Sequence, residues 1–250
     1  MILTVNDLSF HYPGHEVLNN IGFEVGKGEC LAILGTNGAG KSTLLKCLNR
    51  INPIKNGSVT IGGTELSNFG RTYLAKRIGY VSQSTQFTSS TVFDAVLLGR
   101  KPYIKWDVTQ QDLDIVESVL HSLHLTEFSM RYVDELSGGE VQKVSIARAL
   151  AQQPDILMFD EPTSNLDLKN QLEVIQIIKE IVSEKQISAI VTMHDLNLAL
   201  RFADKYMMIR SGRVFAAGGS EIMTTENIAK VYSVDVSIEY FNQKPVIIPL

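Results

Sequence analysis

The chain has 250 residues, enough for one sizeable core, and its 44% hydrophobic content is ordinary for a globular protein. Its 23 basic and 27 acidic residues give a formal charge of −4, so no global field attracts nucleic acid or anionic lipid. No apolar run approaches the roughly 20 residues that cross a bilayer, and the first residues lack the basic start and long apolar stretch of a signal peptide. We therefore expect a cytosolic protein that reaches a membrane only through a partner.

The first 30 residues alternate between apolar and polar side chains in the manner of β-strands, and so do residues 57–61. Pro13-Gly14 and Asn56-Gly57 supply turns between these segments. This pattern predicts a small antiparallel sheet near the N-terminus.

Short runs rich in Ile, Val and Leu follow, each bounded by turn or polar residues, at 30–34, 78–82, 156–159 and 189–193. Such runs are typical of strands that are buried on both faces of a parallel sheet. Helical periodicity follows the first run over 42–49 and the third over 169–184. The alternation of strand and helix predicts an α/β fold.

The stretch between Phe87 and Gln153 contains no strand run, and its helical patterns cover residues 91–98, 109–123 and 141–152. This predicts a helical subdomain inserted into the α/β core. We therefore expect a single domain in which residues 1–84 and 154–250 form the core with its antiparallel part. Residues 85–153 would form the helical subdomain.

Each buried run ends in a glycine or a polar residue, namely Gly35, Gln83, Asp160 and His194. In open α/β sheets, ligands bind outside the carboxyl ends of the strands. We therefore expect these four strand ends to converge on one crevice.

Residues 35–43 read GTNGAGKST and fit the phosphate-binding loop pattern GxxxxGK(S/T). The bare pattern arises by chance in on the order of 1 in 100 chains of this length, but here it also lies between a buried strand and a helix. The backbone N–H groups of about residues 38–43 would wrap phosphates, and the helix N-terminus adds a partial charge of about +0.5. Lys41 would reach the outer phosphates and Ser42 would hold magnesium. The alternative, a glycine-rich turn into a helix, leaves Lys41 without a purpose.

The third buried run leads directly into Asp160 and Glu161. Asp160 would lie at the strand end within reach of the magnesium shell, and Glu161 is assigned as the general base. A carboxylate with a pKa of about 4.3 is a weak base, but phosphoryl transfer asks chiefly for a positioned water and late proton acceptance. Alone, such an acidic pair is more often part of a solvated loop; the phosphate-binding loop upstream favours the catalytic interpretation.

Residues 136–140 read LSGGE and form a candidate capping box, with Ser137 as N-cap and Glu140 three residues later. Two glycines at a helix start also expose backbone N–H groups, which makes a second anion site in a chain that has one phosphate-binding loop. A phosphate at this second site would have to come from somewhere other than the chain's one phosphate-binding loop.

In this order, the motifs resemble those of ATP-binding-cassette (ABC) ATPases over essentially the whole chain. The matching segments are residues 35–43, Gln83, LSGGE, LMFDE at 157–161, SNLD at 164–167 and TMHD at 192–195. The resemblance implies a P-loop NTPase core of the RecA-like type, with ATP and Mg²⁺ as cofactors. Two departures, Thr36 in place of proline and VQK at 141–143 in place of QQR, touch no residue with a chemical role.

The resemblance also implies a homodimer and a role for each site residue. The signature residues Ser137, Gly138 and Gly139 would contact the γ-phosphate held by the other subunit, and Asp167 would lie in the loop that crosses the dimer interface. The implied nucleotide contacts within one chain are Tyr12, Asn37, Gly38, Ala39, Gly40, Lys41, Ser42 and Thr43. The implied catalytic group is Glu161, His194, Lys41 and Gln83, and the implied magnesium ligands are Ser42, Gln83 and Asp160. Tyr12 matches the aromatic that stacks on adenine, with a simple turn aromatic beside Pro13 as the alternative.

The favoured function is the ATPase subunit of an importer, with two copies beneath two integral membrane permease subunits at the cytoplasmic face of the cell membrane. An extracytoplasmic substrate-binding protein would act indirectly. Soluble ABC ATPases that act on nucleic acid or the ribosome are the rival class, but they usually carry coiled coils or two cassettes, and we expect no nucleic-acid partner here. A third possibility, half of an exporter, would normally be fused to membrane spans, and the sequence has no apolar run of that length.

Two segments resemble the subfamily that imports metal chelates, namely TVFDAVLLGRKPY at 91–103 and the ending from residue 221 to 250. The resemblance implies a ferric siderophore as the first expectation for the transported substrate, with cobalamin or haem as the alternative.

Overall fold

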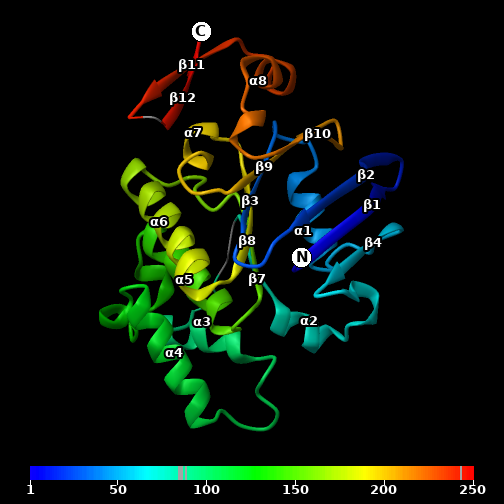
Figure 1. The fold of residues 1–250 in the computed structure, drawn as a ribbon. Coiled ribbons are helices and arrows are strands. Elements are labelled where there is room, and N and C mark those ends of the chain that lie inside the picture. The colour runs from blue at the N-terminus through cyan, green and yellow to red at the C-terminus, as the bar shows by residue number, and fades with distance from the viewer. Residues whose placement is uncertain (84–86, 88, 243) are drawn as a thin grey trace.

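A computed structural model of the chain describes residues 1–83, 87, 89–242 and 244–250. Its larger sheet has the strand order β10-β9-β3-β8-β7-β6 and lies at the centre of the molecule (Figure 1). The strands are β3 (Cys30–Leu34), β6 (Ile78–Val81), β7 (Ile156–Asp160), β8 (Ser188–Met193), β9 (Lys205–Arg210) and β10 (Arg213–Gly218). All neighbours pair in parallel except β10, which pairs antiparallel with β9. The four predicted buried strands are confirmed to within one residue at each end, whereas β9 and β10 were not predicted.

The smaller sheet is antiparallel, as predicted, and has the order β2-β1-β4-β5. Its strands are β1 (Leu3–Tyr12), β2 (His15–Val25), β4 (Asn56–Ile61) and β5 (Thr64–Glu65). Helix α1 (Lys41–Leu48) packs between this sheet and one face of the larger sheet, because its buried leucines share a core with Leu3, Val5 and Ile33. The two sheets thereby fix the helix whose first turn carries the phosphate-binding sequence.

Between β6 and β7, the regular elements of the described residues are all helices, joined by turns and loops, apart from an isolated bridge between Thr91 and Tyr132. It contains α3 (Val92–Leu97), η2 (Leu98–Arg100), α4 (Gln110–Ser122), η3 (Thr126–Phe128), η4 (Val133–Glu135) and α5 (Gly138–Ala151). These helices and α6 (Leu168–Lys185) cover the other face of the larger sheet and share its second core. Figure 1 shows α3 and α4 at the end of the molecule opposite the C-terminus.

The remaining elements were not predicted from the sequence: η1 (Leu66–Asn68), α2 (Arg71–Arg77), α7 (Leu196–Ala199), η5 (Ser220–Ile222), α8 (Thr225–Tyr232), β11 (Val236–Phe241) and β12 (Lys244–Pro249). Residues 71–77 form α2, which buries Leu74 (5% exposed) and leaves Arg71, Thr72 and Tyr73 exposed. Among the described residues, no helix combines the length and apolar character that a transmembrane span requires.

Candidate nucleotide-binding site

The loop from β3 to α1 has a backbone that demands glycine at its last position. Gly40 has a φ of 105°, and a Cβ there would lie 2.8 Å from the Leu18 Cδ2 atom. Asn37 and Gly38 are exposed at the tip of the loop, whereas Ala39 is buried. Gly40 gives α1 no side-chain cap, so the first-turn N–H groups remain available to an anion.

Lys41, the first residue of α1, is only 4% exposed and has its charge paired inside the protein. Its Nζ atom donates to the backbone oxygens of Gly35 at 2.8 Å and Thr36 at 3.2 Å, and it lies 3.4 Å from the Glu161 Oε1 atom. A buried ammonium requires such partners because leaving water is costly. The side chain of Lys41 therefore joins the start of the loop to the residue that follows β7.

Asp160 is 4% exposed at the end of β7 and accepts three hydroxyl hydrogen bonds. Ser42 and Thr192 both donate to its Oδ1 atom at 2.8 Å, and Tyr80 donates to its Oδ2 atom at 3.2 Å. Burial raises the pKa of Tyr80, and the neighbouring Asp160 charge adds to this effect, so the phenol stays a donor. Sequence reasoning missed Tyr80 and Thr192 because each lies inside an apolar strand and reads as core.

Glu161 is held in an unusual backbone conformation, with a φ of 48°, and its side chain is 13% exposed. Its N–H donates to the Thr192 side-chain oxygen at 3.0 Å. Gln83 donates to its Oε2 atom at 3.1 Å, and the His194 Nδ1 atom lies 3.8 Å from the same oxygen. The prediction that the ends of β3, β6, β7 and β8 converge on one crevice is thus confirmed.

The side chains of Ser42, Asp160 and Gln83 offer a hydroxyl, a carboxylate and an amide oxygen. Mg²⁺ prefers oxygen ligands, and it commonly takes one or two protein carboxylates together with substrate phosphates and water. The hydrogen bond between Ser42 and Asp160 shows that two of these ligands already meet, so the residues fit the ion. Among the described residues there is no cluster of three or more His, Cys, Asp or Glu side chains that would hold a metal unaided.

The signature residues lie at the start of α5 and close the predicted capping box. The Ser137 Oγ atom accepts from the Glu140 N–H at 3.4 Å, and the Ser137 N–H donates to the Glu140 Oε2 atom at 2.8 Å. The Ser137 hydroxyl also donates to that oxygen at 2.6 Å, and this bond is the main reason that the pKa of Glu140 is lowered. Glu140 therefore remains charged and satisfies the helix terminus.

Gly139 and Asp167 meet at Asn170, so the signature packs on the start of α6. A Cβ at position 139 would clash with the Asn170 side chain, and Asp167 caps α6 by accepting from the Asn170 N–H at 2.8 Å. Among the described residues, no hydrogen bond or ion pair joins Ser137 or Asp167 to the side chains around Lys41. One chain therefore brings together only part of the predicted site.

Tyr12 ends β1 and is 41% exposed. Its ring stands edge-on to Phe10 with centroids 4.9 Å apart, and its hydroxyl accepts from the Asn52 side chain at 3.2 Å. The outer part of the ring is thus left open on the smaller sheet, as a stacking surface requires.

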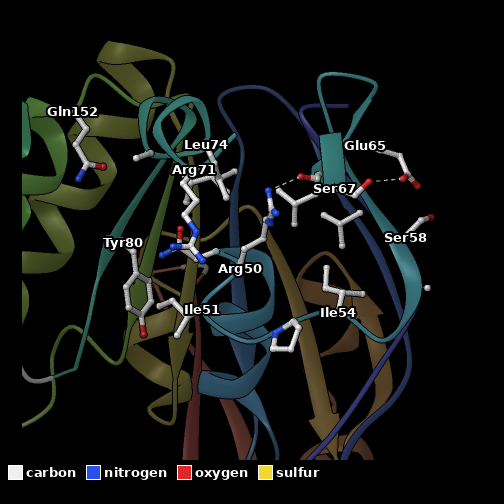
Figure 2. Close-up of a pocket in the computed structure, with 17 residues that line it drawn as sticks. Arg50, Ile51, Ile54, Ser58, Glu65, Ser67, Arg71, Leu74, Tyr80 and Gln152 are labelled. Atoms are coloured by element: carbon white, nitrogen blue, oxygen red, sulfur yellow. Dashed lines mark hydrogen bonds between the residues drawn. The ribbon is translucent and has the colours of Figure 1, made fainter. Parts of the chain in front are cut away.

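A hollow of about 870 Å³ lies beside the crevice and is drawn in Figure 2. Its lining comes from the segment that follows α1, from β4, residues 65–67, α2 and β6, and from Gln152, which directly follows α5. Arg50 and Arg71 point into it together with apolar side chains such as Ile51. Tyr80 lines this hollow while its hydroxyl bonds Asp160, so the hollow and the crevice share one side chain.

Several proteins of related sequence are known. One from Methanocaldococcus jannaschii, an uncharacterized ABC transporter ATP-binding protein, is 53% identical over 100% of this chain and 98% of its own length. The petrobactin import ATP-binding protein YclP of Bacillus subtilis is 31% identical over 95% of each chain. A phosphonates import ATP-binding protein of Rhodopseudomonas palustris is 35% identical over 92% of this chain and 86% of its own.

Solved structures agree with the fold. A chain of an inward-facing transporter assigned to the metal-chelate type superposes with a TM-score of 0.87 at 28% identity, covering 100% of this chain and 97% of its own. A bacterial ABC transporter cassette solved as a dimer gives a TM-score of 0.77 at 27% identity, covering 87% and 98%. The ABC transporter family model matches residues 18–164. This match, the phosphate-binding loop and the two acidic residues at the end of β7 agree with one another. The chain therefore belongs to the ABC transporter family and is one of its ATP-binding, ATP-hydrolysing cassettes.

Proposed function

We propose that this cassette is the ATPase subunit of an importer and works as a homodimer at the cytoplasmic face of the membrane. The observation that carries the proposal is the buried cluster in which Lys41 pairs with Glu161 while Ser42 pairs with Asp160. A phosphate-binding cation, a carboxylate base and oxygen ligands for magnesium are the groups that hydrolysis of a nucleoside triphosphate needs.

In this proposal the phosphates of ATP bind the open N-terminus of α1 and compete for Lys41. Glu161 then loses its ion pair, and its carboxylate accepts the proton of the attacking water. His194 and Gln83, which already contact the same carboxylate oxygen, hold it in place. Mg²⁺ held by Ser42, Asp160 and Gln83 would neutralise charge that develops on the phosphates.

The homodimer follows from what one chain lacks. The N-terminus of α5 carries two glycines, yet nothing in its own chain supplies a phosphate to it. A two-fold axis would place Ser137, Gly138, Gly139 and Asp167 of each chain against the nucleotide held by its partner. The related cassette solved as a dimer supports this arrangement. Tyr12 would stack on the adenine.

We propose that residues 85–153 act as a helical subdomain and that a short helix of a permease docks where this subdomain meets the core. The expected docking groove is lined by residues 83–103; of these, 84–86 and 88 lie outside the described residues. The hollow of Figure 2 adjoins the same boundary through Tyr80 and Gln152, and its lining combines apolar side chains with Arg50 and Arg71, which suits an amphipathic segment.

Cysteine crosslinking tests the permease docking. Both native thiols, Cys30 and Cys47, are buried, so an introduced cysteine would be the accessible one. Leu98→Cys, within the expected groove and 57% exposed, should crosslink to a cysteine in a cytoplasmic loop of the permease, whereas Lys179→Cys on α6 is the control. Crosslinking from the control alone, or co-purification with DNA or ribosomes and no permease, would favour the rival class.

We propose that the transported substrate is a metal chelate and that a ferric siderophore is its first candidate. The petrobactin relative and the metal-chelate neighbour support this choice, and cobalamin or haem is the alternative. The phosphonate relative makes an oxoanion importer the competitor to exclude. The test reconstitutes the cassette with its permease and an extracytoplasmic substrate-binding protein. A binding protein loaded with ferric siderophore should stimulate ATP hydrolysis, and stimulation by a phosphonate alone would overturn the assignment.

A further inference from the structure

The C-terminal segment, residues 225–250, is bonded to the short helix that follows His194. Asn197 lies in this helix, α7, and its side-chain amide pairs with the backbone of Ile247 in β12. Its Nδ2 atom donates to the Ile247 oxygen at 2.9 Å, and its Oδ1 atom accepts from the Ile247 N–H at 2.9 Å. One side chain thus bonds a strand residue in the way that a neighbouring strand would.

Helix α7 depends on such contacts because it has only four residues. A helix of this length is not stable by itself in water. Asp195 caps it by accepting from the Leu198 N–H at 2.9 Å, and the pair between Asn197 and Ile247 fixes its exposed side. Strand β12 is held in turn by full pairing with β11, and the Leu250 N–H donates to the Asp235 oxygen at 3.0 Å.

Tyr232, the last residue of α8, carries a second buried polar group of the same segment. Among the described groups, none forms a hydrogen bond with its buried hydroxyl oxygen. Burial is the main cause that raises the pKa of this phenol. The connection between the C-terminal segment and α7 is therefore carried by Asn197.

We propose that the C-terminal segment is a brace that sets the position of His194, with Asn197 as a positioning residue for ATP hydrolysis. The inference rests on the proposed role of His194. It accounts for the pair of hydrogen bonds between Asn197 and Ile247, which the chemistry of the crevice does not use. Their consequence is that the helix after His194 is tied to the C-terminal hairpin.

Asn197→Leu tests the brace because it keeps the size of the side chain and removes both hydrogen bonds. The readouts are kcat and KM for ATP and the ¹³C–¹H resonance of His194 in histidine-labelled protein. We expect kcat to fall about tenfold, in line with the loss of two hydrogen bonds, with KM nearly unchanged and the His194 resonance shifted. Asn197→Asp, which keeps the acceptor for the Ile247 N–H, should give a smaller effect of the same kind. Tyr240→Ser, at a position in β11 that is 73% exposed, is the control and should change nothing.

Tyr232→Phe removes only the hydroxyl and is a second control from the same segment. We expect the parent kcat and KM for ATP, since this hydroxyl makes no hydrogen bond with the described residues. Parent kinetics with an unshifted His194 resonance in Asn197→Leu would overturn the brace, even if the melting temperature fell. A loss of kcat in Tyr232→Phe as large as that in Asn197→Leu would also overturn it, because any change in the segment would then have the same effect. The resonance reports the position of His194 whether or not this histidine takes part in hydrolysis. Parent activity in His194→Ala would therefore refute the catalytic role separately from the brace.

Discussion

Glycine lies just before α1 and in the first turn of α5, but the N–H groups of the two first turns are satisfied in opposite ways. Helix α1 starts after Gly40, has no side-chain cap and has no acidic residue in its first turn. Helix α5 starts after Ser137 and is closed by a capping box with Glu140. The first terminus is open to a phosphate, and the second is occupied by a carboxylate of its own chain.

In the proposed dimer, this difference would let the two termini meet phosphate at different stages. The open terminus of α1 would bind the nucleotide of its own chain without any rearrangement. At α5, Ser137 would have to exchange its bond with Glu140 for a bond to a phosphate, and a partner chain would have to bring that phosphate. The exchange is acceptable because the capping box satisfies the helix while the chain is alone.

The largest effect is expected for Glu161→Gln, which leaves the open terminus intact while removing the proton acceptor. Hydrolysis should fall by about 10²- to 10⁴-fold, the range for loss of a general base. ATP affinity should be retained, because the amide keeps the shape of the side chain and no longer competes for Lys41. Steady-state turnover and equilibrium ATP binding measure the two effects. Turnover near the parent rate would refute Glu161 as the base.

Lys41→Ala and Ser137→Ala compare the two termini directly. Loss of the Lys41 ammonium should weaken ATP binding by about 10²-fold, as expected when one partner of a buried charged contact is removed. Ser137→Ala should leave ATP binding to the separate chain unchanged, since its terminus is closed there. Titration with a fluorescent ATP analogue at a protein concentration below that of dimerisation measures both. Equal losses would mean that both termini serve the same bound nucleotide within one chain.

Mixed dimers sharpen the comparison further. Chains with Lys41→Ala and chains with Ser137→Arg should each be inactive alone, because every site has one defect. A mixed dimer has one site with both defects and one site with neither, so ATPase activity should recover to about half of the parent at most if the sites act independently. Normal hydrolysis by Ser137→Arg as a dilute monomer would refute the composite site.

Glu140→Gln should give the smallest effect, and its pH dependence identifies the cause. The pKa of Glu140 is lowered in the folded chain, so its charge stabilises the fold at pH values above its unfolded pKa of about 4.3. This contribution is lost as pH falls through the folded pKa. The variant should therefore be less stable by about 0.3–1 kcal/mol at pH 7, the scale of a charge at a helix terminus, and equal to the parent at low pH. Urea unfolding at both pH values measures the difference. A gap that persists in acid would point to packing instead.

The sequence was sufficient to predict the core strands and the crevice because their signals are local. A buried strand that ends in Asp160, or a glycine loop that ends in Lys41, can be read from adjacent residues. The hydroxyls around Asp160 could not be predicted in this way, because Thr192 faces Asp160 only through the register of β7 and β8. Nothing within the run of residues 188–193 distinguishes Thr192 from a core residue.

The C-terminal hairpin shows a second reason for missed elements. Strand β12 contains Pro245 and Pro249, and proline argues against a strand unless the strand lies at an edge. Whether it is an edge depends on its partner, which here is β11 alone. The contact between Asn197 and Ile247 joins residues 50 positions apart and leaves no periodic trace in the sequence. Helix α2 was not predicted because charged side chains dominate its sequence. Its one buried leucine is a weak signal of a helix that packs on a core.

The ion pair between Lys41 and Glu161 couples the roles proposed for these two residues. Their charged atoms lie 3.4 Å apart, so each charge neutralises the other. In the proposed mechanism, a triphosphate that binds Lys41 would break this pair and free the carboxylate of Glu161. Binding of the substrate and release of the base would then be a single event.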